Sequence, residues 1–127
     1  MINFNKNSVW NLTPISLNSI HGDIAGLLIK DEQPVAAFKT VRDQLIFTNK
    51  RIISMDAQGL TGKRRSFTSL PYSKIQFFSI QTPGLVELFS DSELFLYFSN
   101  GFEAMFEFKG RTDIGQLGRI ISEYVLG

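Results

Sequence analysis

Residues 38–51 read FKTVRDQLIFTNKR, and residues 58–65 read QGLTGKRR. The first segment is rich in β-branched and aromatic residues, which favour strands, and polar residues interrupt it at positions 42–43 and 49–50. The second segment has glycine at both ends of residues 59–62, where the chain can reverse sharply. Together the two segments predict a module of strand, turn, strand, turn and strand.

The sequence pattern typical of strands continues to about residue 109. From Val35 onward apolar and polar residues alternate with a period of two, which is typical of strands whose two faces differ. Asn100-Gly101 is the strongest hairpin signal in the chain. Beyond the opening module, strands are expected at about residues 63–70, 75–81, 85–89, 93–99 and 102–109. The pattern predicts a mainly β protein, or α+β when its helices are counted.

Two segments have helical spacing instead. Between residues 15 and 29 apolar residues recur three or four positions apart, which predicts one amphipathic helix that ends before Pro34. The helical period returns after residue 110, with Thr112 or Asp113 as the N-cap. The expected buried stripe of this second helix is Ile114, Leu117, Ile121, Tyr124 and Val125.

The composition fits one ordinary domain. The chain has 127 residues, of which 43% are hydrophobic and 20% charged, a globular balance. The polar N-terminal residues end at Thr13-Pro14 and predict an arm over residues 1–14 that orders only when something docks against it. A single domain is expected over residues 15–127.

Charge and cysteine content exclude several kinds of partner and site. The formal net charge of +1 is too small for a general field that recruits nucleic acid or an anionic membrane, so neither is expected as a partner. The absence of cysteine from the sequence excludes disulfides, thiolate metal sites and cysteine nucleophiles. No secretory signal and no apolar run of about 20 residues is recognisable. We therefore expect a soluble cytoplasmic protein.

Four spaced blocks resemble the signature of the small single-domain bacterial pleckstrin-homology proteins. They are Phe38-Lys39-x-Val41-Arg42-Asp43, Phe47-Thr48-Asn49-Lys50-Arg51, Gln58-Gly59-x-Thr61-Gly62-Lys63 and Pro71-Tyr72-x-x-Ile75. The resemblance runs from about Leu27 to Val125. It implies a bent β-sandwich or partial barrel of seven antiparallel strands with a C-terminal capping helix, to which residues 15–29 add an N-terminal helix. It also implies no established activity, and assembly into rings of identical subunits.

One group of cations is a candidate anion site. The five side chains lie near adjacent turns and could bind phosphate groups of a lipid or the carboxylates of an acidic peptide. They are Lys50, Arg51, Lys63, Arg64 and Arg65. Two other interpretations stay open: the cations protect a sheet edge from pairing, or Arg51 or Arg42 forms ion pairs with Asp43 or Asp56. Lipid-binding relatives of this fold place their cations around the first hairpin, where this chain has only Arg42 and Asp43, which weakens the lipid interpretation.

The sequence offers no catalytic or metal-binding constellation. His21 is the single histidine, and neither a second histidine nor a cysteine is present to complete a metal site with it. Ser90 and Ser92 have no base beside them in the sequence. The glycines of residues 59–62 do not have the spacing of a phosphate-binding loop. We therefore expect a protein that is not an enzyme and has no cofactor and no metal.

Several strands carry apolar residues on both faces. Leu94 and Leu96 alternate with Phe95 and Tyr97, although the outer face of a one-core antiparallel domain should be polar. Extra apolar surface of this kind usually marks an interface. The candidate interface residues are Phe78, Phe89, Phe95 and Tyr97. The alternative is that the N-terminal helix covers this outer face within the same subunit.

These features predict a non-enzymatic interaction or scaffold domain that assembles with itself into a symmetric homo-oligomer, such as a ring. A further protein partner is compatible with the sequence. The alternative function is peripheral binding of anionic ligands, such as lipid head groups or acidic peptides, by the five cations named above.

Overall fold

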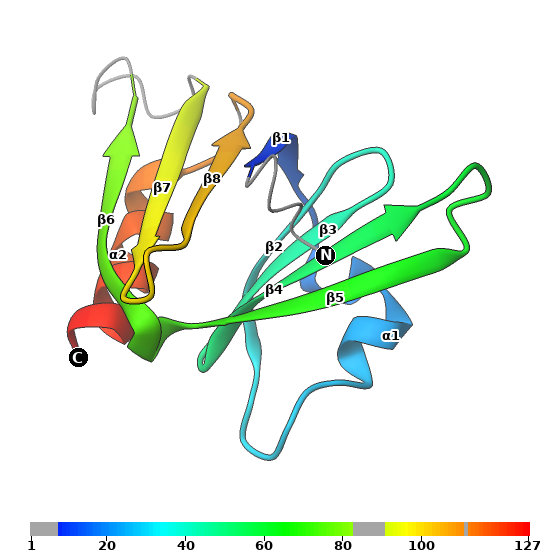
Figure 1. The fold of residues 1–127 in the computed structure, drawn as a ribbon, viewed down its shortest axis with the longest axis horizontal. Helices are drawn as coiled ribbons and strands as arrows, with labels where there is room; N and C mark the ends of the chain where they lie inside the picture. The colour runs from blue at the N-terminus through cyan, green and yellow to red at the C-terminus, as the bar shows by residue number, and fades with distance from the viewer. Residues whose placement is uncertain (1–7, 83–90, 111) are drawn as a thin grey trace.

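The computed structural model of the protein describes residues 8–82, 91–110 and 112–127. In this part of the chain eight strands form one sheet in the order β5-β4-β3-β2-β1-β8-β7-β6. The strands are β1 (Ser8–Pro14), β2 (Pro34–Lys39), β3 (Gln44–Thr48), β4 (Arg51–Gln58), β5 (Arg64–Pro71), β6 (Ile75–Gln81), β7 (Ser92–Phe98) and β8 (Glu103–Phe108). The sheet bends into two halves, β2–β5 and β6–β8, and helix α2 (Ile114–Leu126) packs behind the second half (Figure 1). The expected mainly β class and the C-terminal capping helix are confirmed.

Strand β1 joins the two halves of the sheet. Its C-terminal end pairs with β2 in antiparallel fashion, with Pro14 opposite Phe38. Its N-terminal end pairs with β8 in parallel, with Ser8 opposite Met105. The β1–β8 pairing shifts register between Val9 and Leu12, and this bulge includes Asn11, whose φ of 62° lies in the left-handed region that asparagine tolerates.

This strand corrects the prediction of an N-terminal arm over residues 1–14. Residues 8–14 belong to the sheet, and Leu12 is fully buried. The described fold therefore has eight strands rather than seven, and one of its pairings is parallel. Residues 1–7, and the strand expected at residues 85–89 with its Phe89, lie outside the described part of the chain.

The main core fills the space between the two halves of the sheet and α2. Its centre is aromatic: the ring of Phe38 meets Phe47 and Phe108 edge to face, at centroid distances of 5.8 and 4.8 Å. From α2, Ile114, Leu117 and Ile121 complete it. The stripe expected for this helix is confirmed, and the side chain of Asp113 caps its N-terminus by accepting the Gln116 N–H at 3.0 Å.

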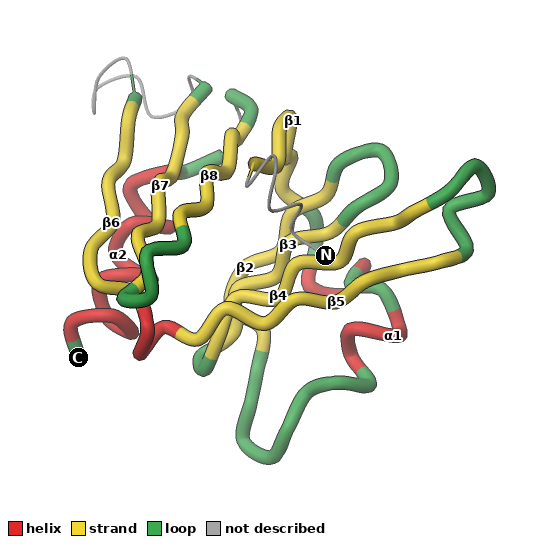
Figure 2. The backbone as a smooth tube through the Cα atoms, viewed as in Figure 1, coloured by secondary structure: helices red, strands yellow, loops and turns green. Residues whose placement is uncertain are grey.

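A second, smaller core lies on the opposite face of β2–β4. We call residues 15–33, between β1 and β2, the N-terminal segment. Its Ile24 is fully buried there against Ala37, Ile46, Ile53 and Met55. The N-terminal segment therefore covers the outer face of the first half of the sheet. Figure 2 shows that most of this segment is loop.

The single helix predicted for residues 15–29 is wrong. The chain forms a 3-10 turn at Leu17–Ser19 and a four-residue helix α1 (Gly22–Ala25). Each short element has its own N-cap. The side chain of Ser16 caps the 3-10 turn by accepting the Asn18 N–H, and that of His21 caps α1 by accepting the Asp23 N–H. Each cap begins a new short element, so the segment does not form one continuous helix. Its apolar residues Ile15, Ile20, Ile24 and Leu28 nevertheless pack in the second core.

The turns follow the sequence signals, with one difference in mechanism. Asn100-Gly101 joins β7 to β8, and Gly101 has the positive φ of 89° that only glycine adopts freely. Asn49 lies in the β3–β4 turn without a positive φ, although asparagine tolerates one. Its amide instead pins the preceding loop, accepting the Gln33 N–H at 2.8 Å and donating to the Asp31 carbonyl at 2.9 Å.

Candidate functional site

The outer face of β6–β8 carries a group of apolar side chains bordered by polar ones, among them Ser79 and Gln81. Cross-strand partners in a sheet project from the same face. On the outer face Phe77 is paired with Tyr97, and Phe95 with Met105. We call these four residues, with Glu93 and Glu103 at the two ends of the row, the aromatic face. The alternate residues of β7, such as Leu94 and Leu96, point inward and are fully buried.

Aromatic rings of this face lie in contact with solvent. Phe77 is 53% exposed, and its ring stacks on that of Tyr97 with a centroid distance of 4.2 Å and an angle of 11°. Phe95 and Tyr97 are partly buried. Val9 of β1 packs against the main core, so the next residue, Trp10, points to the outer side and is also 53% exposed.

Neither described helix covers the aromatic face. Helix α2 packs on the inner side of β6, where an added Cβ on Gly118 would come within 2.6 Å of Ile80 Cδ1. The N-terminal segment lies over β2–β4, in the other half of the sheet (Figure 1). The alternative that this segment covers the outer side of β7 within the same subunit is therefore wrong.

Phe78, one of the predicted interface residues, lies on the inner face of the sheet and not on the outer face. Phe78 is paired with Leu96 and packs against the main core, whereas its neighbour Phe77 points outward. The pairing of β6 with β7 shifts between Ile75 and Phe77. Such a one-residue irregularity moves the following side chains to the opposite face, and a period-two reading of the sequence cannot detect it.

Carboxylates border the aromatic face. Glu93 and Glu103 form no ion pair with any described residue. Glu107, on the same side of β8, accepts the Asn11 N–H at 3.1 Å and lies 4.0 Å from the Lys109 ammonium. These glutamates could not be recognised from the sequence, because their meaning depends on the rings that lie near them in the folded sheet.

The far end of the first half-sheet carries a second exposed surface. The β2–β3 and β4–β5 turns meet there, because the Arg42 guanidinium donates to the Gly59 carbonyl at 2.6 Å. Each turn presents a fully exposed apolar side chain, Val41 at 101% and Leu60 at 106%. Around them are the exposed cations Lys63 and Arg64. We call Val41, Arg42, Leu60, Lys63 and Arg64 the basic tip.

The five cations predicted as one anion site do not come together. Arg64 pairs with Gln58 at one end of the β4–β5 hairpin, and Arg51 pairs with Pro71 at the other. Seven residues of extended strand separate the ends by about 24 Å. Lys63, Arg64 and Arg65 thus lie at the tip, whereas Lys50 and Arg51 lie near the bend of the sheet.

The guanidinium of Arg51 also has hydrogen-bond partners within the chain. Its guanidinium donates to Glu32 Oε2 at 2.9 Å and Oε1 at 3.0 Å, and to the Leu27 carbonyl at 2.8 Å. Burial by itself would raise the pKa of Glu32, but hydrogen bonds from Arg51, Thr48 and the Ile29 N–H outweigh burial and lower it. This ion pair ties the loop before β2 to the β3–β4 turn.

A polar hollow of about 300 Å³ lies beside the basic tip. Lys39, Arg42 and Arg65 line it together with His21 and Asp43. Burial raises the pKa of Asp43, opposed by the hydrogen bond that its carboxylate accepts from the Ala57 N–H at 2.8 Å. His21 serves as the N-cap of α1, so the structure gives it a structural role.

Two larger hollows each have a single charged lining residue. The hollow of about 430 Å³ between β2 and α2 has Asp113 as its single charged lining residue. The hollow of about 510 Å³ between β5 and the β7–β8 turn also has one charged lining residue, Lys74. Within residues 8–82, 91–110 and 112–127, no three acidic or histidine side chains gather as a metal site would require. None of the helices in these ranges has the length and hydropathy of a membrane span.

Comparison with known proteins identifies the family. Residues 3–125 match the family model described as Bacterial PH domain. The uncharacterized protein YjqA of Bacillus subtilis (strain 168) is 43% identical over 89 residues, which are 70% of this chain and 70% of YjqA. The uncharacterized protein YozO of the same strain is 32% identical over 103 residues, covering 80% of this chain and 86% of YozO.

Solved structures agree with this result. A DUF1696 family protein with a pleckstrin-homology domain from Shewanella loihica PV-4 has a TM-score of 0.77 and 31% identity, over 92% of this chain and 99% of that one. A pleckstrin homology domain from Shewanella amazonensis SB2B has a TM-score of 0.66 and 35% identity, over 89% and 90% of the two chains. The chain belongs to the bacterial pleckstrin-homology domain family.

Proposed function

We propose that the protein is a non-enzymatic scaffold domain that assembles with copies of itself through the aromatic face. The observation that carries this proposal is the stacked pair Phe77–Tyr97, which lies on a sheet face that neither α2 nor the N-terminal segment covers. Exposed apolar surface of this kind is stabilised when a second protein surface excludes water from it.

The chemistry of the two larger hollows supports a role without catalysis. A general acid and base, or a nucleophile and its base, must lie within hydrogen-bond reach of each other or of one bound substrate. The two larger hollows have one charged lining residue each, Asp113 and Lys74. The cysteine-free sequence suits a reducing compartment, and we place the scaffold in the cytoplasm on that ground.

The test is the mass of the particle in solution. Light scattering coupled to size exclusion, at micromolar protein, should give a multiple of the subunit mass of 14.4 kDa. Phe77→Ser and Phe95→Lys should each reduce that mass to one subunit. The matched control is Ile29→Ser, because Ile29 is 60% exposed but lies in the loop before β2. A wild-type monomer at these concentrations would refute the proposal.

A second candidate function is the binding of anionic ligands at the polar hollow beside the basic tip. The observation that favours it is the convergence of Lys39, Arg42 and Arg65 on one hollow. This candidate predicts salt-sensitive binding of inorganic phosphate that Arg65→Ala abolishes and Lys50→Ala leaves unchanged. Binding that is absent, or equally affected by both variants, would eliminate it.

A further inference from the structure

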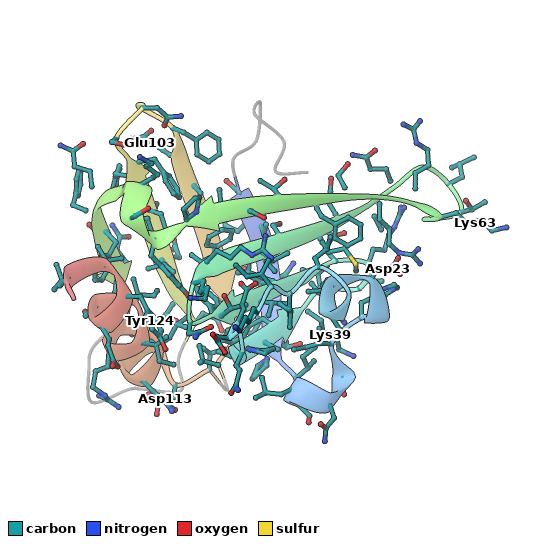
Figure 3. All side chains as sticks on the ribbon, turned by 90° about the horizontal axis from the view of Figure 1, so that it is seen from below. Asp23, Lys39, Lys63, Glu103, Asp113 and Tyr124 are labelled. Atoms are coloured by element: carbon teal, nitrogen blue, oxygen red, sulfur yellow. The ribbon has the colours of Figure 1, made fainter. Side chains whose placement is uncertain are left out.

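Strand β5 forms one end of the described sheet. It pairs with β4 along its whole length, from Arg64 opposite Gln58 to Pro71 opposite Arg51, without a register shift. No described strand pairs with its other edge. In Figure 3, β5 runs from the turn at Lys63 toward the half of the sheet that contains Glu103. An unpaired edge of this kind is a template on which another strand can pair.

The free edge of β5 presents hydrogen-bonding groups from alternate residues. On β4, the Arg51 N–H donates to Thr48 Oγ1 at 3.0 Å and the Ala57 N–H to Asp43 Oδ1 at 2.8 Å, so odd-numbered residues face β3. Even-numbered residues of β4 therefore face β5, where the pairing joins them to even-numbered residues. The odd-numbered residues of β5 then direct their N–H and C=O groups away from the sheet. Those with both groups are Arg65, Phe67 and Ser69.

The middle of this edge lacks the usual protection against pairing. Charged side chains, proline or a bulge normally prevent a second strand from joining an exposed edge. In β5 the arginines stand at the first two positions and Pro71 at the last, and the pairing with β4 contains no bulge. Residues 66–70 between them read SFTSL and carry no charge. A strand can therefore join the edge at this central stretch.

The hollow of about 510 Å³ lies beside this stretch. Leu70 and Phe98, both of the main core, line it, and the ring centroid of Phe102 lies 5.7 Å from that of Phe98. A strand paired with β5 projects every second side chain from the same face as Thr68 and Leu70, which is the face that lines the hollow. The volume is within the range of about 300–1,000 Å³ typical of ligand pockets. A large apolar side chain of the added strand can therefore fill the hollow.

The charge around the hollow favours an acidic occupant. Among the described residues, Lys74 is the one charged residue in the lining, and it is exposed and forms no ion pair. Arg64 and Arg65 add two more cations on β5, which contains no carboxylate. Opposite charges across an interface select the partner and fix its register. The β5 strand of a second copy would bring two arginines and no carboxylate, so it does not supply this complement.

We infer that the edge of β5 binds an extended acidic segment of a partner protein. The segment adds a strand to the sheet along Arg65, Phe67 and Ser69, places an apolar side chain in the hollow and pairs a carboxylate with Lys74. Backbone hydrogen bonds then supply affinity, whereas the hollow and Lys74 supply specificity. Strand β5 lies in the other half of the sheet from the aromatic face, so this inference goes beyond the proposed self-assembly and does not depend on it.

The probe that tests the inference is a phage-displayed library of random linear peptides, selected on the wild-type protein. Selected peptides should carry a large apolar residue with an acidic residue close to it, and the Kd of each is measured by fluorescence anisotropy. Ser69→Pro removes one outward N–H at an exposed position and should raise Kd at least about tenfold. Its matched control, Ser69→Ala, keeps that N–H and should change Kd by less than about twofold.

A second pair of variants tests the charge. Lys74→Glu should raise Kd about fivefold or more at low salt, and the loss should shrink as salt screens the pair. Lys30→Glu makes the same change at an exposed position of the N-terminal segment and should leave Kd unchanged. Far-ultraviolet circular dichroism of each variant verifies that it is folded.

Each contrary outcome overturns the inference. If the library yields no peptide above background, the edge does not bind an acidic segment. If selected peptides bind folded Ser69→Pro and Ser69→Ala equally well, they bind elsewhere on the molecule. If Ser69→Pro but not Ser69→Ala lowers the particle mass in light scattering, a second copy occupies the edge. The variants Phe77→Ser and Phe95→Lys test the proposed self-assembly separately, so either idea can fail without the other.

Discussion

The carboxylate of Glu32 and the guanidinium of Arg51 form a two-point ion pair, with Nε and Nη2 of Arg51 at 2.9 and 3.0 Å from the two carboxylate oxygens. The Glu32 side chain is fully buried and that of Arg51 is 21% exposed. Thr48 donates a further hydrogen bond to the same carboxylate at 2.7 Å. This pair links the irregular loop after α1 to the β3–β4 turn, so its removal should affect the stability of the whole fold.

Replacement of Glu32 tests the contribution of this ion pair to stability. Glu32→Gln leaves the largely buried Arg51 cation without its counter-charge, and we expect the free energy of unfolding to fall by about 2–3 kcal/mol. Urea denaturation measures this change. Glu123→Gln, at an exposed position of α2, should stay within about 0.5 kcal/mol of wild type. Equal effects of the two variants would contradict the prediction.

The same ion pair predicts a pH dependence. The pKa of Glu32 is lowered in the folded protein, so its contribution to stability is complete above its ordinary value of 4.5. The contribution is lost as the pH falls below that value toward the lowered pKa. The stability gap between wild type and Glu32→Gln should therefore be constant near neutral pH and shrink in acid. A gap that widens as the pH falls would show that the sign is wrong.

Tyr72 offers a test of one buried hydrogen bond. Its hydroxyl donates to the Thr48 carbonyl at 2.7 Å, and its ring stacks on Tyr124 at a centroid distance of 5.1 Å. Tyr72→Phe keeps the stack but leaves the carbonyl without this donor, and should cost about 1 kcal/mol. Thermal unfolding measures the loss. Tyr124→Phe, which keeps the same stack, should be close to neutral, and a larger effect of Tyr124→Phe would refute this explanation.

The contact between α2 and β6 can be tested with a double-mutant cycle. Alanine at position 118 favours the helix by about 1 kcal/mol, but its Cβ would come within 2.6 Å of Ile80 Cδ1. Ile80→Val removes that atom. We expect Gly118→Ala and Ile80→Val together to cost at least about 0.5 kcal/mol less than the sum of the single changes. Ser122→Ala should be additive with Ile80→Val, and additivity for Gly118→Ala as well would exclude the steric contact.

The regular elements could be predicted because their signals are local. The strands after Val35, the Asn100-Gly101 turn and the stripe of α2 each follow from a period of two, a turn dipeptide or a period of 3.6. Strand β1 could not be predicted in this way. Its sequence is short and interrupted by the bulge at Asn11, and one of its partners, Met105, is far from it in the sequence.

The surfaces were predicted only in part, for geometric reasons. Phe95 and Tyr97 lie on the outer face as their alternation indicates, but the shift in β6 exchanges Phe78 for Phe77. The cations of the β4–β5 hairpin lie near turns in the sequence, but these turns are at opposite ends of strand β4. Arg51 and Arg64 are therefore separated by the length of that strand. Val41 and Leu60 are a usable sequence signal, because they are apolar residues inside polar turns, and both are fully exposed within the described part of the chain.

The two-sided pairing of β1 also constrains how the chain reaches its native state. The pairing of Ser8 with Met105 cannot form on the ribosome until the chain has emerged beyond residue 105. Proteins rich in such distant pairings have high contact order and fold slowly, because the entropy of closing a long loop is lost before the contact stabilises anything. The β2–β5 half, with its short connections, should therefore nucleate first, and closure of the sheet by β1 should be the late, rate-limiting step.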